Sequence, residues 1–265
     1  MTKQEARAAS EAAFGQFGET ARRERVEQYR LDRTARFMDR YAGGVRGKRI
    51  LELGCSFGVN LAIMKRLGAA RVVGVDYFIF PDVTANDFTV QQEAFAVAQQ
   101  VWKKEGMDVT KSNLADPLPF PDGSFDLVVA NAVIEHLHGI HQHVFREANR
   151  VLAPGGSFVF TTPNLASLLK RVRFAFGRSP NWDVDDYVSS GTNFTGHVRE
   201  FTVAECRRML SLAGFFPSRV VAETGYFKWH WLWNPRKIHR FVFQALARLS
   251  PNLGDLIYAI GTKKQ

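Results

Sequence analysis

The fold of this chain is decided by one stretch, Arg49-Ile50-Leu51-Glu52-Leu53-Gly54-Cys55-Ser56-Phe57-Gly58-Val59-Asn60. Its apolar beginning predicts a short buried strand, and the periodic residues 61–67 after it predict a helix. Gly54 and Gly58 provide the tight turn between the two elements. Because a helix that begins at such a turn exposes free N–H groups, this stretch is typical of a site for the polar tail of a nucleotide-like ligand.

The details of the turn narrow the kind of ligand. A dinucleotide-binding turn would have glycine at positions 54, 56 and 59, whereas this chain has Ser56 and Val59 at the last two. The Gly-Lys-Ser/Thr ending of a phosphate-binding loop is also missing. Glu52 stands just before the turn, where an acid repels a pyrophosphate and favours an ammonium or sulfonium. Serine takes little room but favours an ordinary backbone angle, so Ser56 weakens the sequence signal for this turn without cancelling it.

Length and composition favour one large domain, or one with a small appended cap, because 265 residues can bury a sizeable core. Cys55 and Cys206 lie far apart without a partner pattern, so we predict no disulfide framework and no metal site. The chain has neither a leader-like apolar segment at its start nor an uninterrupted apolar run of about eighteen residues. We therefore expect a cytoplasmic protein that does not span a membrane.

The motif from Glu52 to Gly58 resembles the first motif of class I S-adenosylmethionine-dependent methyltransferases, whose usual pattern is acid-x-Gly-x-Gly-x-Gly. The resemblance implies that S-adenosyl-L-methionine is the cofactor and that it contacts Glu52, Gly54, Ser56 and Gly58. It also implies an α/β, Rossmann-like fold: a seven-stranded, mostly parallel sheet with one antiparallel strand, helices on both faces and cap insertions. The resemblance extends over residues 49–164, where five motifs follow in the order of the family.

A second buried strand, predicted over residues 71–76, ends in Asp76, 22 residues after Gly54. An acid at the carboxyl end of this strand can accept hydrogen bonds from both hydroxyls of a ribose, so we expect Asp76 to bind the cofactor. A strand-end turn residue is the alternative. The aromatic loop 77–88, which begins with Tyr77, either walls the adenine or forms a partner surface, and a helix over 90–104 follows it.

The segment after a third predicted strand (107–112) resembles the family segment that contacts the adenine amino group. Asn113 stands where the family usually has aspartate, followed by Leu114; an asparagine oxygen can still accept from an exocyclic amine. A fourth strand, predicted over 125–131, ends at Asn131. Because the carboxyl ends of strands form the site of an open α/β sheet, Asn131 is expected at the cofactor as well.

The remaining elements complete the sheet that the resemblance implies. A helix over 146–153, a Pro-Gly-Gly turn and a strand over 157–162 again resemble the family. Thr202 and Glu205 form a capping box that opens a further helix, ending at Gly214. Strands are predicted over 215–224 and 256–261, and the resemblance implies that the last one lies antiparallel beside the sixth.

We expect a single methyltransferase domain over residues 1–265. Its predicted parts are N-terminal helices (1–48, helical from about residue 11), a cofactor-binding core (49–164), a cap insertion (165–201) and the C-terminal part of the sheet (202–265). The last part contains a basic, aromatic insertion at 225–254.

The net charge of +9 is unevenly distributed, because 15 Lys/Arg and only 7 Asp/Glu lie from residue 165 onward. Such asymmetry indicates an acidic partner. Residues 226–249 combine tryptophan, lysine and arginine with an amphipathic helix, and residues 226–248 contain no acid. This pattern is typical of an interfacial segment on an anionic membrane, so we expect peripheral contact with the inner membrane face. A core-packed helix with a solvated basic face is the alternative.

Methyl transfer is an in-line attack, to which positioning and the exclusion of water contribute much. A hydroxyl nucleophile also benefits from a base, and His136 and His197 are the candidates because imidazole accepts a proton readily near neutral pH. A structural role for each remains open. We predict a hydroxyl acceptor on a small molecule, a sugar or a lipid-linked intermediate.

Three other functions remain open: a small-molecule N-methyltransferase, an RNA methyltransferase and a non-catalytic cofactor-binding module. Nucleic acid is disfavoured because an RNA enzyme should show an Asn/Asp-Pro-Pro-aromatic motif at the fourth strand, where this chain has Asn131-Ala132-Val133-Ile134.

Overall fold

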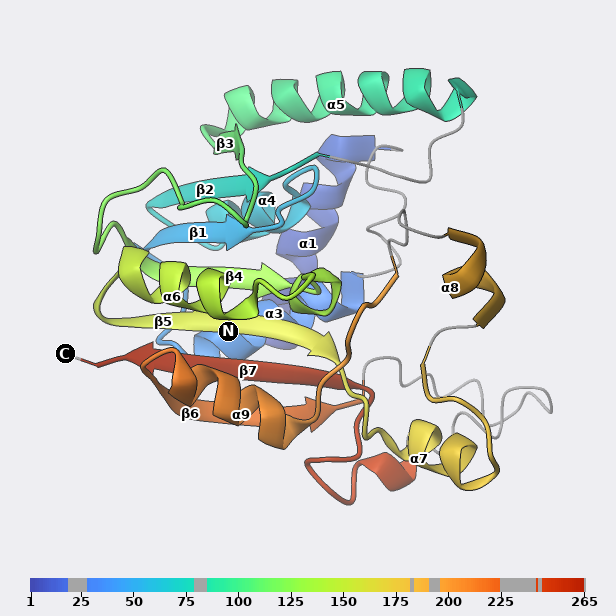
Figure 1. Cartoon of the computed structure of the whole chain (residues 1–265). Helices are drawn as coiled ribbons and strands as arrows, with labels where there is room; N and C mark the ends of the chain where they lie inside the picture. The colour runs from blue at the N-terminus through green and yellow to red at the C-terminus, as the bar shows by residue number, and fades with distance from the viewer. Residues whose placement is uncertain are drawn as a thin grey trace.

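One seven-stranded sheet with the order β3-β2-β1-β4-β5-β7-β6 runs through the computed structural model (Figure 1). The structure describes residues 1–18, 28–78, 85–181, 184–190, 196–224, 242 and 245–264, without the side chains of 85–91, 186 and 190. The strands are β1 (Arg49–Leu53), β2 (Arg71–Asp76), β3 (Asp108–Lys111), β4 (Phe125–Asn131), β5 (Leu152–Pro163), β6 (Phe215–Glu223) and β7 (Leu256–Lys263).

Strands β1 to β5 pair in parallel, and β7 inserts antiparallel between β5 and β6. This arrangement confirms the predicted Rossmann-like methyltransferase fold, including its single antiparallel strand. The bounds predicted for β2 and β4 are those observed. All of these parallel strands direct their carboxyl ends toward one edge of the sheet, which is where the site lies.

Helices cover both faces of the sheet (Figure 1). The described helices are α1 (Lys3–Phe17), α3 (Gln28–Tyr41), α4 (Val59–Arg66), α5 (Ala85–Glu105), the 3-10 helix η2 (Ile134–His136), α6 (His141–Val151), α7 (Leu168–Ala175), α8 (Val184–Ser190) and α9 (Val203–Leu212). Of these, α7 and α8 lie beyond the ends of the strands and not on a face of the sheet (Figure 1).

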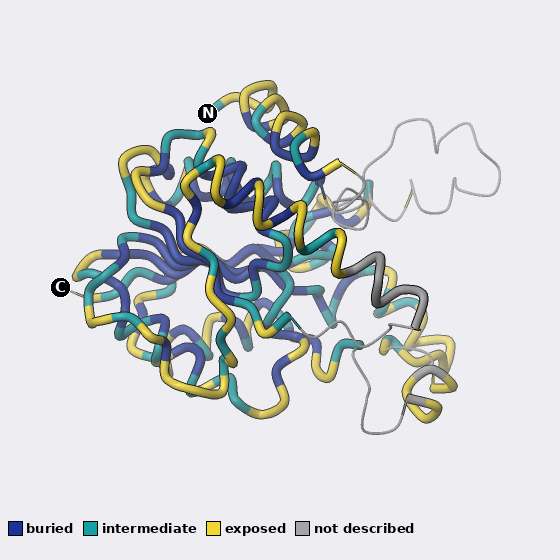
Figure 2. Tube along the Cα trace, turned by 90° about the horizontal axis from the view of Figure 1, so that it is seen from above, coloured by how far each residue is buried: buried dark blue, intermediate teal, exposed yellow. Residues whose placement is uncertain are grey.

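Successive residues of β1 point to opposite faces and join two separate apolar cores. Ile50 packs with α1, α3 and α4, whereas Leu51 and Leu53 pack with α6 and α9. Seen from above, the strands are buried between these helical layers (Figure 2). The sheet is therefore fixed from both sides.

Several element boundaries differ from the sequence prediction. Helix α1 begins at Lys3 rather than near residue 11, because Thr2 and Glu5 form a capping box and its apolar face is buried. Helix α5 begins at Ala85, so the loop after β2 is shorter than predicted, and α6 begins at His141 because Val144 and Phe145 already belong to the core.

The predicted Pro-Gly-Gly turn lies inside β5 and bulges from it. Pairing with β4 passes from Phe125↔Leu152 directly to Leu127↔Ser157, so the residues between Leu152 and Ser157 have no partner in that ladder. Gly155 has φ +75°, a conformation that glycine adopts readily. The predicted turn and the predicted strand 157–162 therefore both lie within β5, which is one irregular strand.

The cap insertion is attached to the sheet at Asn164. Asn164 pairs with Phe201 in an isolated bridge, and its buried Nδ2 donates to the carbonyl oxygens of Asn252 (3.0 Å) and Gly254 (2.7 Å). Most of the predicted membrane segment 226–249 lies outside the described residues. Within the described ranges, every helix is too short or too polar to cross a membrane.

Candidate active site

The turn after β1 depends on close contacts that its two glycines permit. Gly54 has φ +66°, and a Cβ at this position would lie 2.6 Å from Cγ2 of Val133. Gly58 has φ +89° and begins α4, and a Cβ there would lie 2.9 Å from Nε1 of Trp102. That indole N–H donates to the carbonyl of Phe57 at 2.8 Å. The loop after β4 and helix α5 therefore both pack against this turn.

Three non-glycine residues among those described have the left-handed backbone conformation: Ser56 (φ +49°), Phe78 (φ +52°) and Ala132 (φ +51°). They follow β1, β2 and β4, which are neighbours in the sheet. The expectation of an ordinary backbone angle at Ser56 is wrong. Such conformations cost free energy, and they cluster at ligand sites where surrounding contacts hold them.

Asp76 supplies the contacts that hold two of these turns. Its Oδ2 accepts from the N–H of Ser56 and its Oδ1 accepts from the N–H of Phe78, both at 2.8 Å. Each carboxylate oxygen has a further lone pair, so both oxygens can still accept from a ligand. The structure therefore brings Asp76 together with the Gly54–Gly58 turn, in contacts that also suit the alternative of a strand-end turn residue.

Glu52 lies beneath the same turn as a buried acid. The Nδ2 of Asn60, in the first turn of α4, donates to its Oε1 at 2.7 Å and fixes the carboxylate. A buried negative charge favours a positively charged ligand group nearby. Asn60 belongs to the quoted motif stretch, but sequence reasoning did not assign it a role.

The predicted adenine residues lie at the carboxyl ends of β2 and β3. The Oδ1 of exposed Asn113 accepts from the N–H of Ala115 at 3.0 Å, so this oxygen already closes a local turn. Leu114 is half-buried against the core. Tyr77 is exposed, with Nζ of Lys111 5.4 Å from the centre of its ring.

Asn131 is buried at the end of β4, and only part of the hydrogen-bonding capacity of its side-chain amide is used. Its Oδ1 accepts from the hydroxyls of Thr34 (3.1 Å) and Thr161 (3.3 Å), which come from α3 and β5. Its Nδ2 meets no acceptor among the described residues. A buried donor without an acceptor is costly, and such groups are rare in folded proteins unless a ligand or water serves them.

The two predicted catalytic histidines are brought together at the end of β4. His136, in η2, and His197, in the cap, have ring centres 5.1 Å apart at a 78° angle. The N–H of Val198 donates to the carbonyl of Glu135 at 2.8 Å, which holds the cap segment against η2. The Glu135 carboxylate is fully buried, and donor atoms of Glu135, His136 and His197 lie within 4.8 Å of one another.

His197 is further supported by residues of the cap. Its Nδ1 lies 2.9 Å from Oε1 of Glu200, and Oε2 of Glu200 forms an ion pair with Lys170 of α7. Burial, followed by the neighbouring charges of His136 and Lys170, lowers the pKa of His197 to about 4. The imidazole is therefore neutral at physiological pH and a weak base by itself. Burial also lowers the pKa of Lys170 to about 8.

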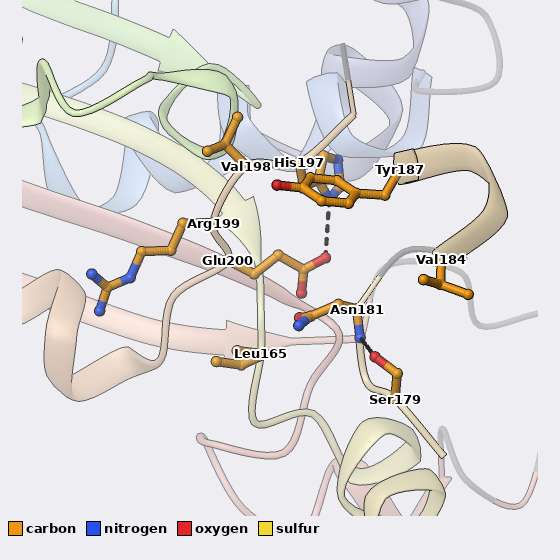
Figure 3. A pocket seen from close by; sticks show the side chains of 9 residues that line it. All are labelled: Leu165, Ser179, Asn181, Val184, Tyr187, His197, Val198, Arg199 and Glu200. Carbon is orange, nitrogen blue, oxygen red and sulfur yellow. Dashed lines mark hydrogen bonds and ion pairs between the residues drawn. The ribbon is translucent and has the colours of Figure 1, made fainter. Parts of the chain in front are cut away.

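A cavity of about 430 Å³ opens beside this group (Figure 3). Its wall is formed by cap residues: Leu165, Ser179, Asn181, Val184, Tyr187 and the segment 197–200. Sequence reasoning missed Glu200 and Lys170 as site residues. The His-x-x-Glu spacing of His197 and Glu200 was the available signal, although it lies in a segment without regular secondary structure.

Comparisons with known proteins agree with this geometry. A family model described as "Methyltransferase domain" matches residues 22–249. A "Probable S-adenosylmethionine-dependent methyltransferase" of Mycolicibacterium smegmatis is 33% identical over 189 residues, which are 71% of this chain and 60% of that protein. The chain thus spans less than two thirds of that relative.

Two further likenesses concern the core and the fold. A malonyl-[acyl-carrier protein] O-methyltransferase of Legionella pneumophila is 34% identical over 122 residues, covering 43% of this chain and 36% of that protein. The crystal structure of an S-adenosylmethionine-dependent methyltransferase from Mesorhizobium loti aligns with a TM-score of 0.54 at 21% identity. That alignment covers 83% of this chain and 92% of the other, and it demonstrates a shared fold.

Proposed function

This chain belongs to the S-adenosylmethionine-dependent methyltransferases, and on that premise we propose that its acceptor is a hydroxyl of a small molecule, a sugar or a lipid-linked intermediate. When bound, the cofactor supplies a sulfonium methyl group: the methyl carbon bonds to the acceptor oxygen as its bond to sulfur breaks, the bonding electrons stay on sulfur, and the hydroxyl proton leaves to solvent. The residues of the chain bind and orient the cofactor and the acceptor, and they activate the acceptor hydroxyl.

The carboxyl edge of the sheet fits the cofactor. The buried Nδ2 of Asn131 is a donor without a described acceptor, and the strained turns at Ser56, Phe78 and Ala132 follow β1, β2 and β4, which are neighbours in the sheet. We propose that Asp76 accepts from the ribose and that the buried charge of Glu52 favours the charged end of the cofactor. The proposed binding set is completed by Gly54, Ser56, Gly58, Tyr77, Asn113, Leu114 and Asn131.

The single observation that carries the hydroxyl proposal is the convergence of His136, His197 and Glu135 beside the cap cavity. A hydroxyl is a poor nucleophile until its proton is removed, whereas an amine attacks once it is neutral. A cluster of groups that can contact and activate an oxygen is therefore more useful for a hydroxyl acceptor than for an amine acceptor. The core similarity to an O-methyltransferase supports the same choice.

We also propose that the acceptor is delivered at an anionic membrane surface through residues 226–249. Among the described residues of this segment, Leu249 is 80% exposed and Leu246 is 46% exposed, with Arg248 between them. Exposed leucines beside a basic residue suit an interfacial contact. In a flotation assay, the parent protein should float with vesicles that contain anionic lipid, and a Leu246→Asp/Leu249→Asp variant should not. Equal flotation of both proteins would refute this contact.

The test of the proposed function uses labelled cofactor and fractionated host extract. We expect label to enter the small-molecule or lipid fraction and product analysis to find the methyl group on oxygen. Label on nitrogen would contradict the hydroxyl proposal, and label in the RNA fraction would favour an RNA methyltransferase instead. Tight cofactor binding in calorimetry without transfer to any fraction would favour a non-catalytic binding module.

A further inference from the structure

Glu135, His136 and His197 form a group of a different chemical kind from the residues assigned to the cofactor. We propose that these three residues bind one divalent transition-metal cation of the Zn²⁺ class at the boundary between β4 and the cap. Two imidazole nitrogens and one carboxylate oxygen are a frequent ligand set for such cations. Their donor atoms lie within 4.8 Å of one another. The expectation of no metal site rested on the spacing of the two cysteines, whereas these ligands are two histidines and a glutamate.

The hydrogen bonds of the two imidazoles prepare them as ligands. The Nδ1 of His136 lies 3.2 Å from the carbonyl oxygen of Gly196, and the Nδ1 of His197 lies 2.9 Å from the Glu200 carboxylate. Both partners can only accept, so the proton of each ring belongs on Nδ1 and the lone pair on Nε2. Metal-binding histidines commonly donate their second nitrogen to a carboxylate or a backbone carbonyl in this way.

The electrostatics and the space available also suit a cation. The Glu135 carboxylate is fully buried, and a nearby positive charge offsets the cost of burying a negative one. Ligand bonds of about 2.0–2.2 Å place tetrahedral donors about 3.3–3.6 Å apart. Because the three ligand atoms lie within 4.8 Å of one another, the widest pair must close by at most about 1.5 Å. The His136 ring is exposed, so its side chain has room to supply this adjustment.

The role of the cation rests on the proposed function. Three protein ligands leave an open coordination position, which a hydroxyl of an acceptor in the adjoining cavity can occupy. Coordination lowers the pKa of the bound hydroxyl, whose proton is then released to water. His136 and His197 thereby act as ligands that activate the acceptor through the cation.

The test measures metal binding directly, without an acceptor. The full chain is stripped with a chelator and titrated with Co²⁺, whose visible absorption reports coordination, and Zn²⁺ is then added in competition. We expect one Co²⁺ per chain, displaced by Zn²⁺. His136→Ala and Glu135→Gln should weaken binding at least about 10-fold, and Glu200→Gln about 10-fold, because a supporting hydrogen bond is lost.

His143→Ala is the matched control, because His143 lies on α6 and bonds the carbonyl of Asp116 at 3.1 Å, away from the cluster. Cofactor affinity by calorimetry should be unchanged in His136→Ala, which checks folding. Absence of Co²⁺ binding in the parent, or undiminished binding by His136→Ala, would overturn the site. Full methyl transfer by the stripped enzyme would overturn the role of the cation, whereas a bound cation without any methyl transfer would overturn the proposed function and leave the site intact.

Discussion

Replacing Asp76 by asparagine tests whether one carboxylate supports both the strained turns and the cofactor. Its oxygens accept from the N–H groups of Ser56 and Phe78, each at 2.8 Å. An asparagine keeps one accepting oxygen but places a donor opposite the other N–H group. A hydrogen bond to a charged group is worth about 1.5–3 kcal/mol, so the melting temperature should fall by about 3–12 °C for a domain of this size.

The same substitution should weaken cofactor binding. Loss of one charge-assisted hydrogen bond to a ribose hydroxyl again corresponds to about 1.5–3 kcal/mol, or roughly a 10-fold to 150-fold rise in Kd. Titration calorimetry with S-adenosylmethionine and thermal unfolding measure the two effects. Asp108→Asn is the control, because Asp108 begins β3 and its carboxylate bonds the exposed Arg71 side chain, away from the turn after β1. Parent-like affinity in Asp76→Asn would refute the ribose assignment.

The remaining predictions concern the turn, the histidine cluster and acid stability. Gly54→Ala should lower both cofactor affinity and the melting temperature, because φ +66° costs alanine about 1–2 kcal/mol and the new Cβ would lie 2.6 Å from Val133; unchanged unfolding would contradict this. His197→Ala should lower turnover by at least about 10-fold while calorimetry finds cofactor affinity nearly unchanged, because His197 belongs to the cluster proposed to activate the acceptor; equal losses would remove it from catalysis. Hydrogen bonds from Arg49 lower the pKa of Asp126, so its stabilising effect is present above the unfolded pKa of about 3.9 and is lost as the pH falls through the folded value. The free energy of unfolding in urea should therefore fall more steeply for the parent than for Asp126→Asn as the pH is lowered from about 5 to 2. Parallel plots of this free energy against pH would argue against the Arg49–Asp126 pairing.

The sheet could be predicted from the sequence because local signals mark its strands. Runs such as those of β2 and β4 are almost entirely apolar, as buried parallel strands are, and each ends in a polar residue, Asp76 or Asn131, at the site edge. The beginning of α1 was missed because its alanine-rich face looks weakly apolar in sequence. Only its packing against α4 reveals that Ala6, Ala13 and Phe14 are core residues.

The backbone of the turn and the histidine cluster could not be predicted in the same way. Ser56 adopts a conformation unfavourable for serine because Asp76, from the next strand, holds its N–H. His136 and His197 are distant in sequence and meet through backbone hydrogen bonds between η2 and the cap. Both features arise from contacts between separate elements, which neither propensity nor periodicity contains.

A series of contacts connects the start of the cap to the buried Asn131 at the cofactor crevice. Asn164 holds the start of the cap against Gly254, and Gly254 lies so close to Glu223 that an added Cβ would be 2.4 Å from the Glu223 carbonyl carbon. Glu223 in turn pairs with Arg33 of α3, the helix whose Thr34 hydroxyl donates to Asn131. The cap and the buried amide at the cofactor crevice thus share one chain of contacts.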